Sequence, residues 1–155
     1  MADRTRDENE MIKIRPAREA EAAAIRDLIH SVGINPMGLD WKRFVVAVND
    51  QDDMIGCGQI KPHGQHVLEL ASIAVYPEQR RKGIARAIIE HLLKHNPRPL
   101  YLMCESSLGP LYEKFGFRIV SYQDMPRYFQ RISKLAGLAT TLARREERLL
   151  IMKLQ

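Results

Sequence analysis

The chain of 155 residues has only two cysteines, and aromatic side chains make up 6% of it. Cys57 and Cys104 both lie in apolar, strand-like segments, so we expect buried free thiols in a reducing compartment. Nothing in the sequence requires the single disulfide that two cysteines allow, and a fold stabilised by several disulfides is excluded.

The sequence also lacks long apolar runs. No segment approaches the roughly 20 apolar residues of a membrane-spanning helix, and the polar start, MADRTRDENEM, has no apolar core like that of a signal peptide. These absences predict a cytoplasmic protein with no membrane partner. We expect a flexible tail over residues 1–10 and a single domain over residues 11–155.

A strong charge of one sign is missing as well. The net charge is +5, and 24 basic residues are spread among 19 acidic ones. A nucleic-acid binder usually concentrates its positive charge on one face or tail. We therefore expect an anionic small molecule as the partner and no nucleic acid.

The periodicity of apolar residues predicts an α/β fold in the order β α β β β α β α β α β. Strands are expected at residues 11–15, 43–49, 54–61, 66–76, 100–106, 117–122 and 148–155, and helices at 16–32, 84–95, 109–115 and 126–145. Three antiparallel strands followed by β-α-β crossovers make a mixed sheet flanked by helices.

One short stretch, VYPEQRRKGIARAII, carries the clearest chemical signal. A strand ends at Pro77, and Arg80, Arg81 and Lys82 then precede Gly83 at the start of a helix. The first amides of a helix lack partners and the helix dipole is positive there, so an anion is favoured. Gly83 lets a phosphate approach the backbone closely. The alternative for this segment alone is a solvated basic turn.

Two spaced motifs resemble the GNAT superfamily of acyl-CoA N-acyltransferases. The first is Val75-Tyr76-Pro77 followed by Arg80-x-x-Gly83-x-Ala85, and the second is LYEKFGF at Leu111–Phe117. The IRPA segment, residues 14–17, is similar to the first strand-to-helix junction of that family. The resemblance covers about residues 11–122 and the final strand.

The resemblance implies a mixed, partly antiparallel sheet of six to seven strands that splays open beside the strand at 66–76. It also implies acetyl-CoA as cosubstrate and no metal. The amides of residues 82–85 would hold the pyrophosphate, and the backbone of Ile73 and Val75 would pair with the pantetheine arm. The residues expected at the cofactor are Ile73, Ala74, Val75, Arg80, Arg81, Lys82, Gly83, Ile84, Ala85, Ser107 and Tyr112. Ser107 stands in CESSLG, where the family often has an asparagine.

The resemblance also implies the chemistry. A neutral amine would attack the thioester directly, with a backbone N–H near Ile73 or Ala74 stabilising the oxyanion. Tyr112 matches the tyrosine that acts as general acid on the departing thiolate. Glu69 stands where many relatives carry a catalytic base. The alternative interpretation is that Glu69 is a glutamate on the solvent-facing side of its strand.

Other features have structural interpretations beside functional ones. His91 and His95 share a helix face but are expected to be structural and not metal ligands, and His63 and His66 are expected to be solvated beside a hairpin turn. The helix at 126–145 is additional to many relatives. Its apolar stripe is Tyr128, Ile132, Leu135, Ala139 and Leu142. It is expected to pack on its own domain, and a homodimer interface or an acceptor-site wall are the alternatives.

The sequence thus predicts an N-acetyltransferase whose acceptor is a small-molecule amine or a protein lysine or N-terminus. A non-catalytic CoA-binding sensor is the alternative from another class. A nucleic-acid binder built on basic turns ranks last.

Overall fold

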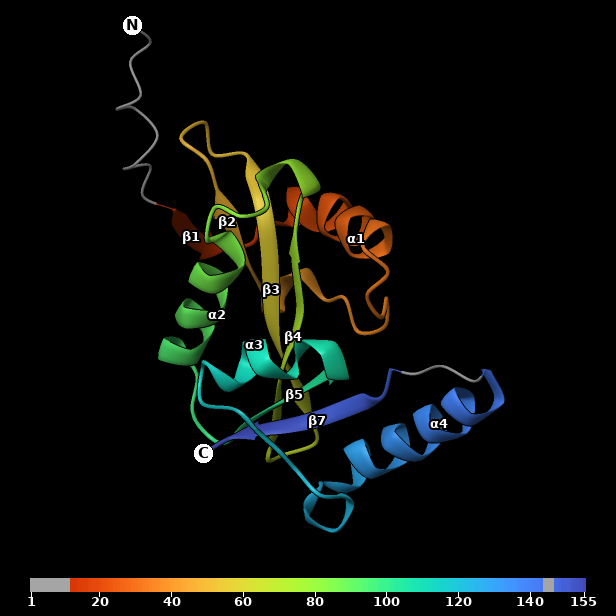
Figure 1. Ribbon diagram of the computed structural model, residues 1–155. Coiled ribbons are helices and arrows are strands. Elements are labelled where there is room, and N and C mark those ends of the chain that lie inside the picture. The colour runs from red at the N-terminus through yellow and green to blue at the C-terminus, as the bar shows by residue number, and fades with distance from the viewer. Residues whose placement is uncertain (1–11, 144–146) are drawn as a thin grey trace, which may run out of the picture. The chain divides into compact units, whose positions relative to one another are not determined.

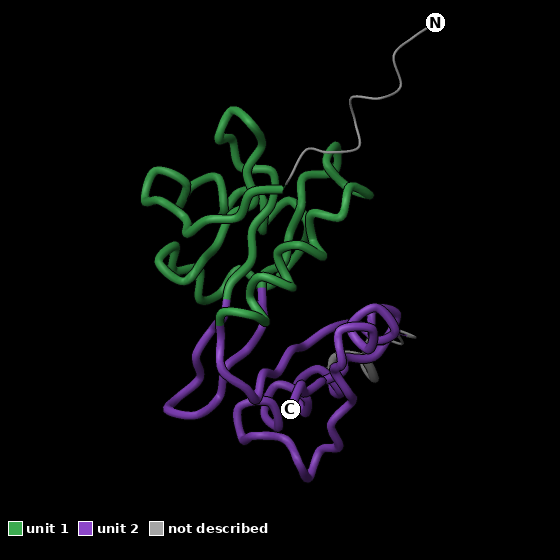
Figure 2. Tube along the Cα trace, turned by 90° about the vertical axis from the view of Figure 1, so that its left-hand side faces the viewer, with its two compact units in different colours: residues 1–59, 72–95 green, residues 60–71, 96–155 purple. Residues whose placement is uncertain are grey.

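The structure is a computed structural model that describes residues 12–143 and 147–155. It divides into two compact units, residues 1–59 with 72–95 and residues 60–71 with 96–155 (Figure 2). The predicted tail over residues 1–10 lies outside the described residues, and a single domain over residues 11–155 stays a prediction.

The order of elements along the chain is the predicted one (Figure 1). The strands are β1 (Lys13–Pro16), β2 (Phe44–Val48), β3 (Met54–His63), β4 (Val67–Val75), β5 (Leu100–Glu105), β6 (Arg118–Ile119) and β7 (Leu149–Leu154), and the helices are α1 (Ala22–Ser31), α2 (Ile84–His95), α3 (Gly109–Glu113) and α4 (Arg127–Ala143). The strands form a seven-stranded sheet in the order β1-β2-β3-β4-β5-β7-β6.

The sheet is mixed, as predicted. β4 and β5 are parallel and share the register pair Glu69 with Tyr101. The pairs β1–β2, β2–β3, β5–β7 and β6–β7 are antiparallel. The β5–β7 ladder runs from Leu100 to Glu105, so β5 is anchored mainly to β7. A parallel ladder as short as the one between β4 and β5 is what the expected splay requires.

Several helices and strands begin or end at residues other than the predicted ones. The first helix does not start at Pro16, because a 3-10 turn, Glu19–Glu21, precedes α1. β3 continues to His63, two residues beyond the predicted end. The predicted strand at 117–122 is reduced to the two residues of β6, because the Phe117 amide donates to the Tyr112 carbonyl oxygen of α3 and a 3-10 turn begins at Tyr122.

The core of the first unit lies between α1 and the sheet. Ile25, Leu28 and Ile29 of α1 pack against a cluster that includes Phe44 and Cys57. On β3, a Cβ added to Gly58 would lie 2.6 Å from Ile73 Cδ1 and 2.7 Å from Ile88 Cγ2. The absence of a side chain at Gly58 therefore makes room for the apolar face of α2.

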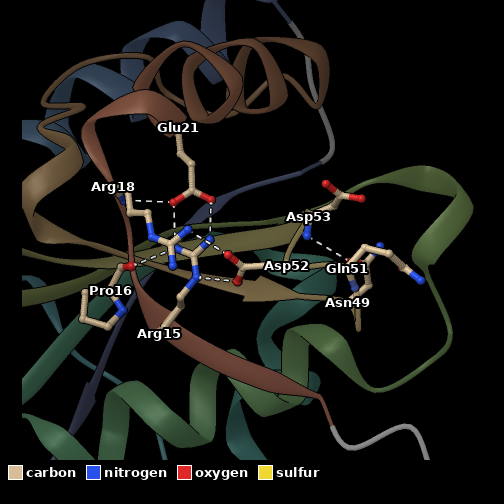
Figure 3. Close-up of polar contacts among 8 residues, drawn as sticks. All are labelled: Arg15, Pro16, Arg18, Glu21, Asn49, Gln51, Asp52 and Asp53. Atoms are coloured by element: carbon tan, nitrogen blue, oxygen red, sulfur yellow. Dashed lines mark hydrogen bonds and ion pairs between the residues drawn. The ribbon is translucent and has the colours of Figure 1, made fainter.

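A charged cluster joins the β2–β3 turn to the end of β1 in the same unit (Figure 3). The Arg15 guanidinium donates to both carboxylate oxygens of Glu21, at 2.8 and 2.9 Å, and to Asp52 at 3.0 Å. Arg18 donates to Asp52 at 2.7 Å and, through its backbone N–H, to Glu21 at 2.8 Å. The hydrogen bond from Arg15 is the main cause that lowers the pKa of Glu21.

We expect Glu21→Gln to lower the free energy of unfolding by about 1 kcal/mol at pH 7, because a charge-assisted bidentate pair is lost. The pKa of Glu21 is lower in the folded chain, so its contribution is present above the unfolded value near ~4.3 and is lost as the pH falls through the folded value. Urea unfolding at pH 7 and pH 3 measures this, and the difference between the variant and the wild type should shrink at pH 3.

The control is Glu90→Gln, which removes an exposed pair with Arg86 on α2. This variant should lower the free energy of unfolding much less than Glu21→Gln does at pH 7, because exposed ion pairs contribute little. An equal loss for both variants would contradict the structural role of the Arg15–Glu21 pair.

The second unit has its own core. Tyr101 of β5, Phe129 of α4 and Ile151 of β7 are buried together, with Tyr128 packed against them. The expected packing of this helix on its own part of the chain is thus confirmed for its first turns. The expected stripe is wrong at Leu135, which is 65% exposed, and it omitted Phe129, which is fully buried. The side chains of Ala139 and Leu142 lie outside the described residues.

Both cysteines are free and buried, as predicted. Burial raises the pKa of Cys57 to about 12 and that of Cys104 to about 11. These thiols stay protonated and weakly reactive at neutral pH. Over residues 12–143 and 147–155, the helices are too short or too polar to cross a bilayer.

Candidate active site

The basic turn of the first unit ends in an open helix N-terminus. A 3-10 turn, Pro77–Gln79, leads through Arg81, with φ of 65°, to Gly83, with φ of 78°. The Gly83 carbonyl accepts from the Ala87 N–H at 3.0 Å, so Gly83 caps α2. The amides of Gly83, Ile84 and Ala85 therefore come before the first intrahelical donor and are available to an anion.

The Arg80–Gly83 turn combines exposed positive charge with open space next to its backbone. Arg80, Arg81 and Lys82 are all exposed, and Lys82 Nζ donates to Gln79 Oε1 at 3.2 Å. A Cβ added to Gly83 would meet nothing within 4 Å, so the space above its backbone is open. The turn thus has the geometry expected of a phosphate site, and the binding roles of these residues stay predictions.

The second half of β4 contains an unusual backbone conformation. Ser72 has a φ of 58°, which is rare for a residue with a side chain and places a kink directly before Ile73. Gln59 Nε2 donates to the Ser72 hydroxyl at 2.9 Å, and Cys57 Sγ donates to the Ser72 carbonyl oxygen at 3.7 Å. Ser72 and Gln59 are both buried. These contacts hold Ser72 in this conformation directly before Ile73, Ala74 and Val75.

Gln59 is a residue that the sequence analysis missed. A glutamine within the apolar strand MIGCGQI is a signal that could have found it, because a buried amide needs partners. Its Nε2 also donates to the Gly38 carbonyl oxygen at 3.4 Å, which links β4 to the loop before Trp41.

Glu69 lies in the first half of β4, in the second unit, and is 3% exposed. The alternative of a solvent-facing glutamate is therefore wrong. His63 Nε2 lies 2.6 Å from Glu69 Oε1. Burial raises the pKa of Glu69, while the hydrogen bond and charge of His63 and the charge of Lys61 oppose that rise.

The expectation that His63 is solvated is also wrong, whereas His66 is exposed as predicted. The His63 side chain is 11% exposed, since its ring stacks on Tyr128 of α4 with the centroids 3.7 Å apart. The reason is the longer β3, which keeps His63 on the strand and under the helix.

Tyr112 lies in α3 and is half-buried. Its ring meets Phe117 edge-on at 6.2 Å, and its carbonyl oxygen accepts from the amides of Phe115 and Phe117. Burial, with a smaller effect of Cys104, raises the pKa of Tyr112. The phenol is therefore protonated at neutral pH, as a general acid must be.

Ser107 is exposed in a 3-10 turn, Ser106–Leu108, after β5. Hydrogen bonds involving Glu105 and then Ser107 lower the pKa of Glu147. Ser107 therefore already has a partner, Glu147, just before the last strand, which could not be predicted from the sequence. Its expected contact with the cofactor stays a prediction.

The expected site residues are distributed between the two units. The residues from Ile73 to Ala85 belong to the first, and Glu69, Ser107 and Tyr112 belong to the second. His91 and His95 stack on each other with centroids 4.2 Å apart, and His95 Nδ1 contacts the His91 carbonyl oxygen. In the described part of the chain, no three His, Cys, Asp or Glu side chains are grouped as metal ligands.

The mixed sheet and the Arg80–Gly83 turn agree with the resemblance to the GNAT superfamily. A family profile described as the acetyltransferase (GNAT) domain matches residues 40–119, just over half of the chain. The chain belongs to the GNAT acetyltransferase family.

Solved structures show the same fold. The N-acetylglutamate synthase of Neisseria gonorrhoeae, in complex with coenzyme A and N-acetyl-glutamate, is 18% identical with a TM-score of 0.72 over 96% of this chain and 36% of that one. Rv2747 of Mycobacterium tuberculosis, in complex with CoA, is 19% identical with a TM-score of 0.70 over 92% of this chain and 98% of that one. Escherichia coli ElaA is 14% identical with a TM-score of 0.66 over 94% of this chain and 100% of that one.

This chain spans about a third of the length of the two N-acetylglutamate synthase structures, 36% and 34%. No curated protein sequence matches it significantly. At these identities the solved structures establish the fold of the chain.

Proposed function

We propose that this protein is a cytoplasmic N-acetyltransferase that transfers an acetyl group from acetyl-CoA to a primary amine in a ternary complex. The observation that carries the proposal is the Arg80–Gly83 turn, where Gly83 caps α2 beside three exposed cations within the matched family segment. The amides of residues 82–85 bind the pyrophosphate, with Arg80 and Arg81 adding charge, and no metal takes part.

The backbone beyond the Ser72 kink has two roles in the proposal. Ile73 and Val75 pair with the pantetheine amides as an added strand does. A backbone N–H at Ile73 or Ala74 donates to the oxyanion of the tetrahedral intermediate. The Gln59 and Cys57 contacts hold the kink and so fix the direction of that donor.

In the proposed reaction Glu69 is the base and Tyr112 is the acid. Glu69 takes one proton from the ammonium group, and the free amine attacks the thioester carbon, so that a C–N bond forms and the C–S bond breaks. Tyr112 protonates the leaving sulfur and recovers a proton from the nitrogen as the amide forms. One proton per turnover returns to solvent from Glu69.

The acceptor is a small-molecule amine or a protein lysine or N-terminus. The N-acetyl-glutamate in a neighbour of the same fold supports including L-glutamate among the first acceptors to test. The alternative is a CoA-binding sensor without turnover. Tyr112 supports the enzyme, since it stands in the LYEKFGF segment where the resemblance places the general acid.

The test is to incubate the protein with acetyl-CoA and a panel of amino acids, polyamines, lysine peptides and free N-terminal peptides, while following the release of free thiol. Turnover with one class identifies the acceptor. CoA binding by calorimetry without turnover on any class supports the sensor, and the absence of CoA binding overturns the proposal.

We expect Gly83→Ala to weaken CoA binding about tenfold, because a Cβ intrudes where a phosphate approaches and the backbone has a φ of 78°. The strain should also lower the free energy of unfolding by about 1 kcal/mol. Calorimetry with CoA and thermal unfolding measure the two effects.

Gly64→Ala is the matched control, because Gly64 has a φ of 69° and also meets nothing within 4 Å of an added Cβ. It should cost the same stability and leave CoA affinity unchanged. Equal weakening of CoA binding by both variants would mean that strain, and not contact with the cofactor, is responsible.

A further inference from the structure

His63, which the family motifs do not include, is placed to control the proposed base. It ends β3, just before the turn to β4, and its Nε2 lies 2.6 Å from Glu69 Oε1. The two side chains are 11% and 4% exposed, so water has little access to the contact. A buried carboxylate costs free energy unless a donor satisfies it, and His63 Nε2 is such a donor in the tautomer that carries the proton on this atom.

The ring of His63 is held on its other side by α4. Tyr128 stacks on it with an interplanar angle of 16°, and Phe129 meets it edge-on at 5.9 Å. A stacked imidazole has little freedom to rotate about χ2, so Nε2 keeps its direction toward the carboxylate. α4 thereby contributes to the surroundings of Glu69 through these two aromatic residues.

The charged and titratable neighbours of the pair come from each element around it. The charge of Lys61 on β3 lowers the pKa of Glu69, and burial, followed by the charge of Glu69, raises the pKa of Tyr128 on α4. Tyr101 on β5 is the register partner of Glu69, and Lys153 on β7 lies 5.7 Å from the Tyr101 ring centroid. His63 lies within hydrogen-bonding distance of the Glu69 carboxylate.

We infer that His63 is a positioning residue for acyl transfer: its Nε2–H, fixed by stacking on Tyr128, keeps Glu69 ionised and aimed as the proton acceptor for the amine. The inference rests on the proposed function. Glu69 accepts the amine proton on its carboxylate, and His63 donates to that carboxylate before and after the transfer without giving up its own proton.

Two variants of His63 distinguish the role of its N–H donor from the role of its aromatic ring. His63→Phe keeps an aromatic ring for the stack and removes the N–H, and His63→Gln keeps an N–H donor near the position of Nε2. His66→Gln is the control, since His66 is an exposed histidine in the same hairpin turn. We expect His63→Phe to move the acid limb of kcat/KM to higher pH and to lower kcat/KM about 10- to 100-fold at pH 7.

His63→Gln should restore kcat/KM to within about threefold of the wild type, and His66→Gln should behave as the wild type. An unshifted acid limb in His63→Phe would overturn the inference. So would a His63→Gln variant as impaired as His63→Phe, because the histidine would then carry the proton itself.

A second measurement does not need an acceptor. The ¹³C shift of the Glu69 carboxyl, followed by NMR against pH, should titrate at higher pH in His63→Phe than in the wild type and His66→Gln. If no amine is ever acetylated but this titration moves as expected, the proposed function fails and the His63–Glu69 interaction stands. If amines are acetylated but the titration does not move, the inference alone fails.

Discussion

Tyr112→Phe is expected to lower kcat about 100-fold at pH 7 while changing the affinity for acetyl-CoA less than about twofold. The substitution removes one oxygen from a half-buried ring and leaves the edge-on contact with Phe117 and the backbone bonds of α3 intact. The thiolate would then leave without a proton donor. Pre-steady-state thiol release and calorimetry with CoA measure the two quantities.

The effect of this substitution should depend on pH in a defined direction. A thiol has a pKa near ~8.5, so the leaving sulfur needs a donor less as the pH rises above that value. The deficit of Tyr112→Phe should therefore shrink at alkaline pH. Tyr122→Phe, at a tyrosine that is 38% exposed after β6, is the control and should retain full activity. A large loss of CoA affinity in Tyr112→Phe would instead make Tyr112 a binding residue.

The basic turn could be predicted from the sequence because its signals are local. Pro77 ends the extended segment, Gly83 allows a positive φ, and the apolar period of the following residues starts at Ile84. Each of these depends on neighbours within a few positions, so no long-range contact was needed to place the helix start at the right residue.

The surroundings of Glu69 and Ser72 could not be predicted in the same way. The His63–Glu69 contact depends on β3 continuing to His63, and the burial of the pair depends on α4, which follows some 60 residues later. The kink at Ser72 depends on Gln59 and Cys57 from another strand. Such contacts follow from strand register and helix docking, which composition and periodicity leave undetermined.

The apolar stripe of α4 shows the same limit on a smaller scale. A period of three and four residues is compatible with two neighbouring faces, and the sequence alone favoured the one through Leu135. Packing on Tyr101 and Ile151 instead selects the face through Phe129. The first turns of the helix meet the sheet, so the residues that decide its orientation are few.

Glu69→Gln is expected to lower kcat/KM about 100- to 1,000-fold at pH 7, because the amine then has to lose its proton to water before it attacks. Lysine and α-amino groups have pKa values near ~10.4 and ~8, so only a small fraction of acceptor is neutral at pH 7. The rate of the variant should rise about tenfold for each pH unit until the acceptor is deprotonated. The wild type should level off at lower pH, where Glu69 becomes ionised.

The pH–rate profiles of the wild type and Glu69→Gln show whether Glu69 acts as a base or has only a structural role. A structural loss lowers the rate by the same factor at every pH, whereas loss of the base is largely repaired at pH 9 to 10. Glu90→Gln on the exposed face of α2 is the control and should follow the wild-type profile. A Glu69→Gln variant with a pH-independent deficit would remove Glu69 from the chemistry. It would leave His63 and Tyr128 as partners that stabilise a buried carboxylate in the second unit.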